Sequence, residues 1–344
     1  MTWDIRIGTG VDLSAFRDLV ARSLVASYLQ DPDWPQYAPR KARHDYLHVT
    51  VGRPGEPLLL AGVLRRSRLP GGLSLGSFRR GPLTAAPSDL ALALPPLIAR
   101  LRRMGLLTLT LNPRWTDEAI APAAAALRRI GAREVPFDRQ TLHQETAVID
   151  LDADLETIRS RFQSNIRTKL RKAARAGVAT LPLTDPAAVA DFDRWLRDLA
   201  GRTGYDTSGL PDAAAQVAHA RACGGVAGEV HLDGTRVGVF IGLRDADRLL
   251  FTAPGWSETS TNLPRLPIVI DALIAEGLRI PGVTAVDLGG VMPADRRGAD
   301  SAADNRERGK HQLNPRIIRL LPMHEVSVVP GAAAAMGLAR RLRS

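Results

Sequence analysis

Cysteine is almost absent from this chain, and its scarcity excludes two kinds of stabilising site. Cys223 is the only cysteine in 344 residues, and one thiol forms neither an internal disulfide nor a cysteine-rich structural zinc site. The seven histidines do not compensate, because His44 and His48 stand four apart beside a strand-like segment and no His-Glu-x-x-His motif occurs. The sequence therefore predicts no metal site.

Long apolar runs are also missing. No stretch approaches the roughly 18 residues that would span a bilayer, and Met1 to Asp4 lacks the charged start and apolar core of a signal peptide. We therefore expect a cytoplasmic protein without a transmembrane segment. A hydrophobic content of 45% and a charged content of 24% are typical of globular proteins, and the length favours two domains.

Lysine is the third scarce residue. It occurs only at positions 41, 169, 172 and 310, so arginine supplies 42 of the 46 basic residues, and the formal net charge is +10. A basic balance suits nucleic acid, an acidic membrane surface or phosphorylated substrates. An arginine-rich and alanine-rich composition also reflects codon usage, so the charge alone identifies no partner.

The chain contains the same order of elements twice. The first half predicts strands at 47–51, 58–64 and 73–78, a helix over Ser88 to Arg103 and a strand over Leu106 to Leu111. The second half predicts strands at 228–232, 236–243 and 248–252, a helix over Leu263 to Glu276 and a strand over Val283 to Leu288. We therefore predict an α/β (α+β) fold of two tandem units, each a mixed sheet flanked by helices.

Between these copies the sequence predicts one long basic helix over Leu155 to Ala176. Ile158, Phe162, Ile166 and Leu170 form its apolar stripe, and Gly177 is placed to end it. The rest of the helix carries seven positive charges without an intervening acid: Arg159, Arg161, Arg167, Lys169, Arg171, Lys172 and Arg175. We place the domain boundary just before it, at Asp150 to Asp152.

The order of meander, helix and strand is also that of acyltransferases related to the N-acetyltransferases. Such enzymes hold the pyrophosphate of acyl-CoA on a glycine-rich turn at a helix N-terminus. Neither Arg79 to Leu83 nor Ala253 to Ser257 offers such a turn clearly. This disfavours an acyl-CoA donor without excluding it.

Several short segments, taken in order, resemble the Fem family of aminoacyl-tRNA-dependent peptidyl transferases. The similar segments are Tyr28 to Trp34, Phe78 to Pro82, Leu109 to Pro113, Ser164 to Val178, Val286 to Gly290 and Gly309-Lys310. The resemblance implies two N-acetyltransferase-like domains without a long helical arm. The first would span residues 1–150 and bind the acceptor, joined by residues 325–344 with a last helix over Ala332 to Leu342. The second, 151–324, would receive the aminoacyl-tRNA.

By the same resemblance Lys310 is the candidate catalytic residue. The family places a lysine here facing the reacting ester, where a fixed cation would stabilise the negative charge that grows on the carbonyl oxygen. The alternative is a solvated lysine in the polar loop Ala294 to Gly309. This sequence departs from the family, since Gly309 replaces the usual preceding aromatic residue.

The resemblance also implies residues that bind the substrates. Arg202 lies in a segment similar to the one whose arginine grips the diphosphate of a nucleotide-linked precursor, and Lys41 or Arg40 would replace the partner lysine of the first domain. Trp256 is a candidate pocket residue. The basic face with Arg167, Lys169, Arg171 and Lys172 would contact the phosphates of tRNA, although a solvated helix face explains the charges as well.

Together these features predict an aminoacyltransferase that moves an amino acid from aminoacyl-tRNA to an amine and forms a peptide or isopeptide bond. The acceptor would be a peptidoglycan precursor or a natural-product intermediate, either a small molecule or nucleotide-linked. No metal or organic cofactor is expected, because aminoacyl-tRNA acts as co-substrate. Two alternatives stay open: an acyl-CoA-dependent N-acyltransferase of the same fold, and a non-catalytic basic RNA-binding protein.

Overall fold

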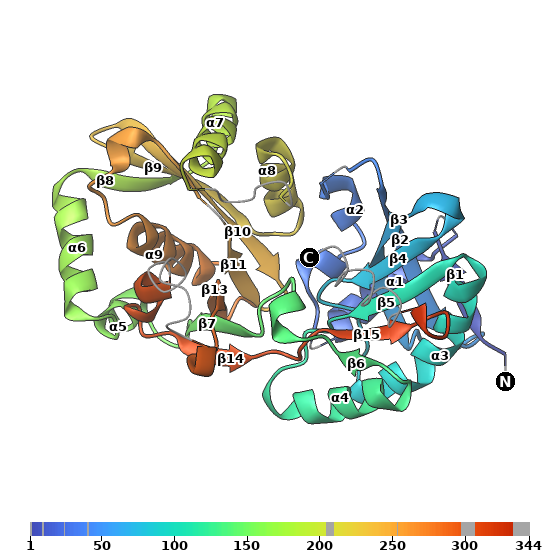
Figure 1. The fold of residues 1–344 in the computed structure, drawn as a ribbon. Helices are drawn as coiled ribbons and strands as arrows, with labels where there is room; N and C mark the ends of the chain where they lie inside the picture. The colour runs from blue at the N-terminus through green and yellow to red at the C-terminus, as the bar shows by residue number, and fades with distance from the viewer. Residues whose placement is uncertain are drawn as a thin grey trace. The chain divides into compact units, whose positions relative to one another are not determined.

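The computed structural model describes residues 2–8, 10–23, 25–39, 41–203, 210–252, 254–296 and 307–332 (Figure 1). The side chains of 202, 203 and 295 are outside the description. The chain forms two compact units, residues 1–36, 40–143 and 319–344 in the first and residues 37–39 and 144–318 in the second.

The first unit is built on a sheet of seven strands. Their order is β1 (Asp4–Ile7), β2 (His44–Gly52), β3 (Leu60–Arg68), β4 (Ser74–Phe78), β5 (Leu106–Leu111), β15 (His324–Ser327) and β6 (Arg133–Glu134). Strands β4 and β5 are parallel, and the other neighbours are antiparallel. The strand that joins β5 to β6 therefore comes from the far end of the chain.

The helices of the first unit begin and end where the sequence provides caps. The helix α1 (Leu13–Arg22) begins at Asp12, whose carboxylate accepts hydrogen bonds from the next turn, and α3 (Pro87–Arg103) is followed by Gly105 at φ +78°. The buried face of α3 consists of Leu90, Ala93, Leu94, Leu97 and Leu101. The remaining helices are α2 (Trp34–Tyr37), α4 (Ile120–Arg129) and the short η1 (Tyr28–Gln30), η2 (Pro70–Gly72), η3 (Asp117–Ala119) and η4 (Phe137–Arg139).

The second unit repeats this plan. Its sheet runs in the order β14 (Arg316–Arg319), β7 (Glu145–Asp150), β13 (Ala285–Val291), β11 (Arg248–Phe251), β10 (Thr235–Asp245), β9 (Val226–Leu232) and β8 (Val178–Pro182), with β12 (Gly255–Trp256) paired to β10. Strands β11 and β13 are parallel, and α9 (Arg265–Gly277) connects them as α3 connects β4 and β5. Two mixed sheets flanked by helices, each with this connection, confirm the predicted fold class.

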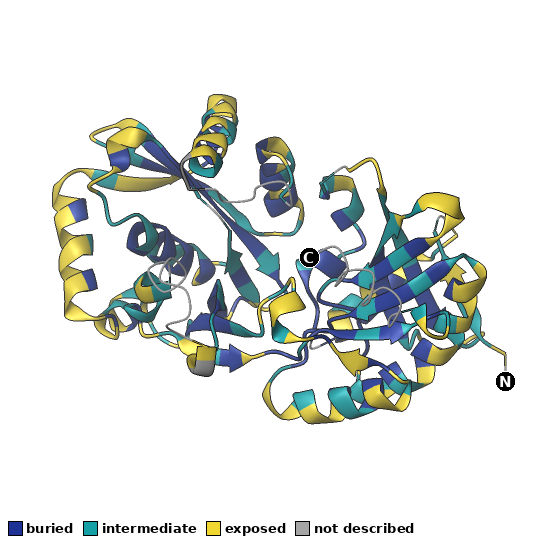
Figure 2. Cartoon of the chain, in the orientation of Figure 1, coloured by how far each residue is buried: buried dark blue, intermediate teal, exposed yellow. Residues whose placement is uncertain are grey.

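Other helices of the second unit fill the spaces around this sheet. They are α5 (Leu155–Ser160), α6 (Ser164–Arg175), α7 (Pro186–Thr203), α8 (Ala213–Ala222), η5 (Glu258–Ser260) and η6 (Ala294–Arg296). Helices α7 and α8 contact β10, whereas α9 contacts β11 and β13. The strand β10 and the helix α9 are mostly buried, while most of α6 and of the edge strand β8 is exposed (Figure 2).

The single helix predicted over 155–176 is wrong, because the structure has two. Helix α5 ends at Ser160 and α6 begins at Ser164. The backbone N–H of Gln163 donates to Gln312 O at 3.1 Å, a tertiary hydrogen bond that a continuous helix would have used internally. The apolar stripe survives the break, since Ile158, Phe162 and Ile166 are all buried.

Two further placements differ from the expected layout or lie outside the description. Strand β7 stands before the expected boundary at 150, yet it pairs with β13 and is part of the second unit. The helix expected over 332–342 falls on residues that, from 333 onwards, lie outside the described part. Among the helices that are described, none combines the length and apolarity that crossing a membrane requires.

Candidate functional site

Lys310 is held against strand β13 by its ammonium group. Residues 307–311 form a short helix, and Lys310 Nζ donates to the carbonyl oxygen of Gly290 at 2.7 Å. The same helix is fixed to the end of β13 because Glu307 Oε1 accepts the backbone N–H of Met292 at 2.7 Å. A half-buried ammonium therefore has a defined position at the C-terminal end of β13.

Strands β11 and β13 of the second sheet stop pairing close to Lys310. Strands β11 and β13 pair from Arg248 with Ala285 to Leu250 with Asp287, and β13 continues to Val291 without further pairing to β11. In the first unit the equivalent strands stay paired to their ends, from Ser74 with Leu106 to Phe78 with Leu111. Lys310 thus lies beside the stretch of β13 that is not paired with β11, whereas β4 and β5 in the first unit stay paired to their ends.

A bulge in β13 shapes the backbone below Lys310. The pairing of β13 with β7 shifts register between Asp287 and Gly290, and Gly289 has a φ of +79° that favours glycine. The buried Asp287 carboxylate accepts the N–H of Gly289 at 2.8 Å and the hydroxyl of Thr146. This carboxylate therefore fixes the bulge, and with it the carbonyl that holds Lys310.

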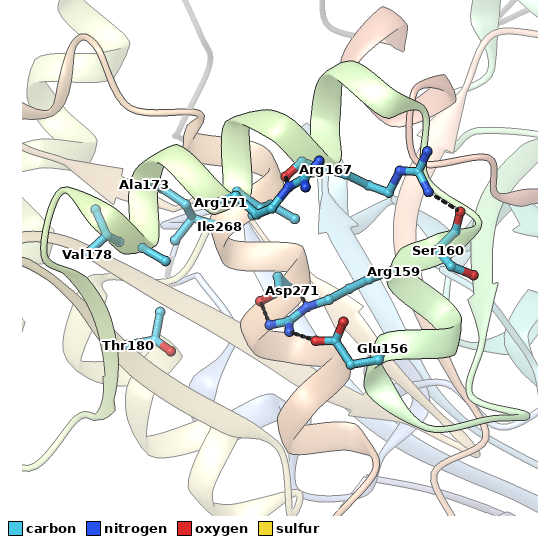
Figure 3. A pocket seen from close by; sticks show the side chains of 12 residues that line it. Glu156, Arg159, Ser160, Arg167, Arg171, Ala173, Val178, Thr180, Ile268 and Asp271 are labelled. Atoms are coloured by element: carbon cyan, nitrogen blue, oxygen red, sulfur yellow. Dashed lines mark hydrogen bonds and ion pairs between the residues drawn. The ribbon is translucent and has the colours of Figure 1, made fainter.

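A pocket of about 630 Å³ lies between α5, α6, β8 and α9 (Figure 3). Its lining is mixed: Glu156, Arg159, Ser160, Arg167, Leu170, Arg171, Ala173, Ala174, Val178, Thr180, Ile268 and Asp271. Arg159 crosses one wall and bonds both oxygens of Asp271, at 2.6 and 2.7 Å, and Glu156 at 2.6 Å. We call this space the α6–α9 pocket.

The four basic residues predicted to contact tRNA lie on α6, and all are exposed. Arg167 and Arg171, four residues apart, line the α6–α9 pocket, whereas Lys169 and Lys172 do not. Within the described residues none of the four forms an ion pair with a carboxylate. The sequence treated them as one basic face, but the 3.6-residue helical turn divides them between two sides.

The first unit contains a second group of basic residues that the sequence analysis did not single out. Tyr46 on β2, Arg65 on β3 and Ser77 on β4 are direct cross-strand neighbours on one face of the sheet. Arg79 follows two residues after Ser77, just past the end of β4, and its charge acts on Arg65. We call Arg65, Arg79 and Tyr46 the first-unit basic cluster.

The cluster has no compensating carboxylate in the described chain. Neither Arg65 nor Arg79 makes an ion pair there, and Arg65 Nε is buried without a hydrogen-bond partner. Burial and the neighbouring Arg79 lower the pKa of Arg65, and burial raises the pKa of Tyr46. Like charges held together in this way favour a bound anion.

Arg65→Met is expected to stabilise the protein by about 1 kcal/mol, because it removes a partly buried, unneutralised charge and keeps an apolar stem. Chemical denaturation at pH 7 measures this change. The neighbouring Arg66→Met is the matched control, since Arg66 bonds Asp45 at 2.7 and 3.1 Å and its removal is destabilising. A loss of stability in both variants would contradict the proposed charge repulsion.

The remaining predicted site residues are placed as follows. Lys41 is exposed in the loop before β2, and Arg40 lies outside the described residues. Arg202 is at the end of α7, and its side chain lies outside the description. Trp256 is 7% exposed in the core of the second unit, where Gly238 leaves room for its ring. This position favours packing over substrate contact for Trp256.

The turn that would hold a CoA pyrophosphate in the first unit is filled by the protein. Gly81 packs against the buried side chain of Gln30, whose amide bonds Arg79 O at 2.7 Å. A Cβ built on Gly81 would lie 2.4 Å from Gln30. In the second unit Gly255 is similarly packed against Phe192 of α7. Across the described residues, no group of three or more His, Cys, Asp or Glu side chains is arranged to hold a metal.

Comparison with known proteins supports an acyltransferase-type fold. Residues 160–300 match the acetyltransferase (GNAT) domain family, and no protein of curated function matches the sequence. The crystal structure of FemX aligns with a TM-score of 0.77 over 95% of this chain and 97% of FemX, at 13% identity.

Two further structures share the fold. L-PGS from Bacillus licheniformis aligns with a TM-score of 0.57 at 12% identity, over 98% of both chains. The C-terminal domain of a protein assigned as a lysylphosphatidylglycerol synthetase from Agrobacterium fabrum gives 0.56 at 14%, over 94% of both. The chain is therefore a tandem protein of the N-acetyltransferase-like fold. The fold is similar to that of FemX, which confirms the Fem-like fold predicted from the sequence.

Proposed function

We propose that this protein is a Fem-like aminoacyltransferase that moves an amino acid from aminoacyl-tRNA to an amine. The observation that supports it best is the position of Lys310. Its ammonium group lies beside the segment of β13 that is not paired with β11. In the reaction the amine nitrogen attacks the ester carbonyl, the C–N bond forms, and the bond to the ribose oxygen breaks. The amine's proton leaves to the released oxygen or to solvent.

Lys310 acts on the charge that develops during this attack. The oxyanion is more negative than the ester carbonyl, so a fixed ammonium lowers the barrier rather than only strengthening binding. Its bond to Gly290 O orients the ammonium group, which can donate several hydrogen bonds. The ester is already activated, so the proposed reaction needs no metal or organic cofactor.

The acceptor in this proposal carries an anionic group as well as its amine. The first-unit basic cluster supplies two guanidinium groups suited to phosphate or carboxylate oxygens. We assign Lys41 and Arg202 as further acceptor-binding residues, in keeping with the resemblance. A nucleotide-linked peptidoglycan precursor and an acidic natural-product intermediate both have this chemistry.

The lysines of α6 contact tRNA phosphates in this proposal, so binding should weaken steeply with salt. Lys169→Gln combined with Lys172→Gln is expected to reduce the slope of log affinity against log salt by about 2, since each phosphate contact contributes roughly 0.9. Fluorescence anisotropy with labelled tRNA between low and high salt measures this. The control, Arg128→Gln with Arg129→Gln on the exposed end of α4, removes the same charge elsewhere. An equal reduction in both would rule out α6 as the contact surface.

A second candidate is an acyl-CoA-dependent N-acyltransferase, which the match of residues 160–300 to the acetyltransferase domain favours. The deciding experiment incubates the protein with bulk tRNA charged with labelled amino acids and a small-molecule extract, and in parallel with acyl-CoA. Label transferred to a small product only from charged tRNA supports the proposal and identifies the amino acid. Turnover of acyl-CoA alone would replace it, and RNA binding without either reaction would indicate a non-catalytic RNA-binding protein.

A further inference from the structure

The α6–α9 pocket has features that contact with an RNA duplex does not explain. Its volume of about 630 Å³ falls within the roughly 300–1,000 Å³ typical of small-molecule sites. A duplex presents phosphates on a convex surface and would meet the exposed outer side of α6. The lining residues instead surround a concave space between two helices (Figure 3).

One wall of the pocket offers guanidinium groups for an anion. Arg167 and Arg171 stand one helical turn apart, so their Cβ atoms are about 5–6 Å from each other. Among the described residues each is held only by a long bond to a backbone carbonyl, Arg167 to Ser160 O at 3.3 Å and Arg171 to Arg167 O at 3.4 Å. Most of their N–H donors are therefore available to a ligand, and a guanidinium fork matches two oxygens of a phosphate.

The facing wall is polar, and its one guanidinium group is paired with two carboxylates, which leaves a formal charge of −1. Arg159 is bound by both Asp271 and Glu156, and the pKa of Arg159 is raised mainly by its hydrogen bonds to Asp271. Thr180 and Ser160 add hydroxyl groups. This wall can accept and donate hydrogen bonds to hydroxyl or amino groups without requiring a charged partner.

The floor between these walls is aliphatic but small. Leu170, Ala173, Ala174, Val178 and Ile268 supply it, five of the twelve lining residues. This area suits one face of a sugar or base, while a lining with seven polar residues does not suit a lipid tail. We propose that the α6–α9 pocket binds a small phosphate ester of a sugar or nucleoside, with its phosphate between Arg167 and Arg171.

The site is independent of the proposed transfer reaction, so it can be tested without RNA or acceptor. Nuclease-treated protein is titrated with adenosine 5′-monophosphate and ribose 5-phosphate by calorimetry, with adenosine and inorganic phosphate as partial ligands. Saturable binding of at least one ester, tighter than either partial ligand, is expected. Binding of neither ester, or binding of adenosine as tightly as its phosphate, would overturn the proposal.

Variants on α6 then locate the site. Arg167→Gln and Arg171→Gln are each expected to weaken binding of the ester about tenfold or more, as loss of a charged hydrogen bond does. Arg175→Gln is the matched control, because Arg175 is exposed on the same helix but does not line the pocket. Equal weakening by Arg175→Gln would show attraction by net charge and overturn the assigned site. The thermal midpoints of the variants without ligand verify that each one is folded.

Discussion

Replacing Lys310 with methionine is expected to slow aminoacyl transfer about 10²–10³-fold, with a smaller effect on tRNA affinity. This is the usual cost of removing one donor to a developing oxyanion. Methionine keeps the length and apolar stem of lysine but cannot donate to the substrate or to Gly290 O. Single-turnover rates with saturating charged tRNA separate the chemical step from binding.

The controls for Lys310 use the same short helix. Arg308→Gln removes an exposed neighbouring charge and should leave the rate within about twofold, as surface substitutions away from structural features have little effect. Lys310→Arg keeps the cation and should recover part of the rate. A Lys310→Met protein with a normal thermal midpoint and an unchanged rate would refute the catalytic assignment.

Arg236→Gln is expected to lower the free energy of unfolding of the second unit by about 3 kcal/mol. The substitution removes the cation of a largely buried charge cluster and leaves its carboxylates without that partner. Arg236 bonds Glu229 and Asp191 at 2.8 Å each and also bonds Asp185. Glu229 is buried, and without Arg236 it keeps only His231 at 2.9 Å. The thermal midpoint should fall by roughly 6–12 °C for a domain of this size, and calorimetry measures this change.

The same cluster gives the protein a pH dependence with a defined sign. Burial alone would raise the pKa of Glu229, but hydrogen bonds from Arg236 and His231, together with their charges, lower it overall. A folded-state pKa below the unfolded value contributes stability above the unfolded pKa, and that stability is lost as pH falls through the folded pKa. The wild type should therefore lose this contribution in acid, below about pH 4.5.

The variant changes this acid response. The difference in thermal midpoint between the wild type and Arg236→Gln should become smaller as the pH is lowered toward 3. Arg194→Gln is the control, because Arg194 is 60% exposed in its ion pair with Asp191 and such pairs contribute about 0–1 kcal/mol. A difference between wild type and Arg236→Gln that stays constant from pH 7 to 3 would contradict the role given to Glu229.

The sequence predicted those parts of the fold that depend on local patterns. The helices α3 and α9 and the strands on either side of them follow from apolar spacing and from breakers such as Gly105. The break between α5 and α6 and the pairing of β15 with β5 depend on hydrogen bonds to residues far along the chain. Local periodicity carries no information about such contacts.

Some residues of the candidate site could be predicted from the sequence, whereas their contacts could not. The scarcity of lysine and the resemblance identified Lys310, but only the structure shows the Gly290 carbonyl and the uncovered edge of β13 beside it. Arg65 and Arg79 are fourteen residues apart and look like ordinary surface charges until strand register makes them neighbours. The separation of Arg171 from Lys169 could have been predicted, because helical periodicity alone places them on different sides of α6.

Strand β15 determines the order in which the two units can be completed. During synthesis β6 leaves the ribosome well before β15, and among the described strands β6 pairs with β15 alone. Between them the ribosome makes residues 144–318 of the second unit, so β5 and β6 are not joined by β15 until that segment has been synthesised. The first unit is therefore begun first and completed last. Because it contains both ends of the chain, a single proteolytic cut cannot separate it intact from the second unit.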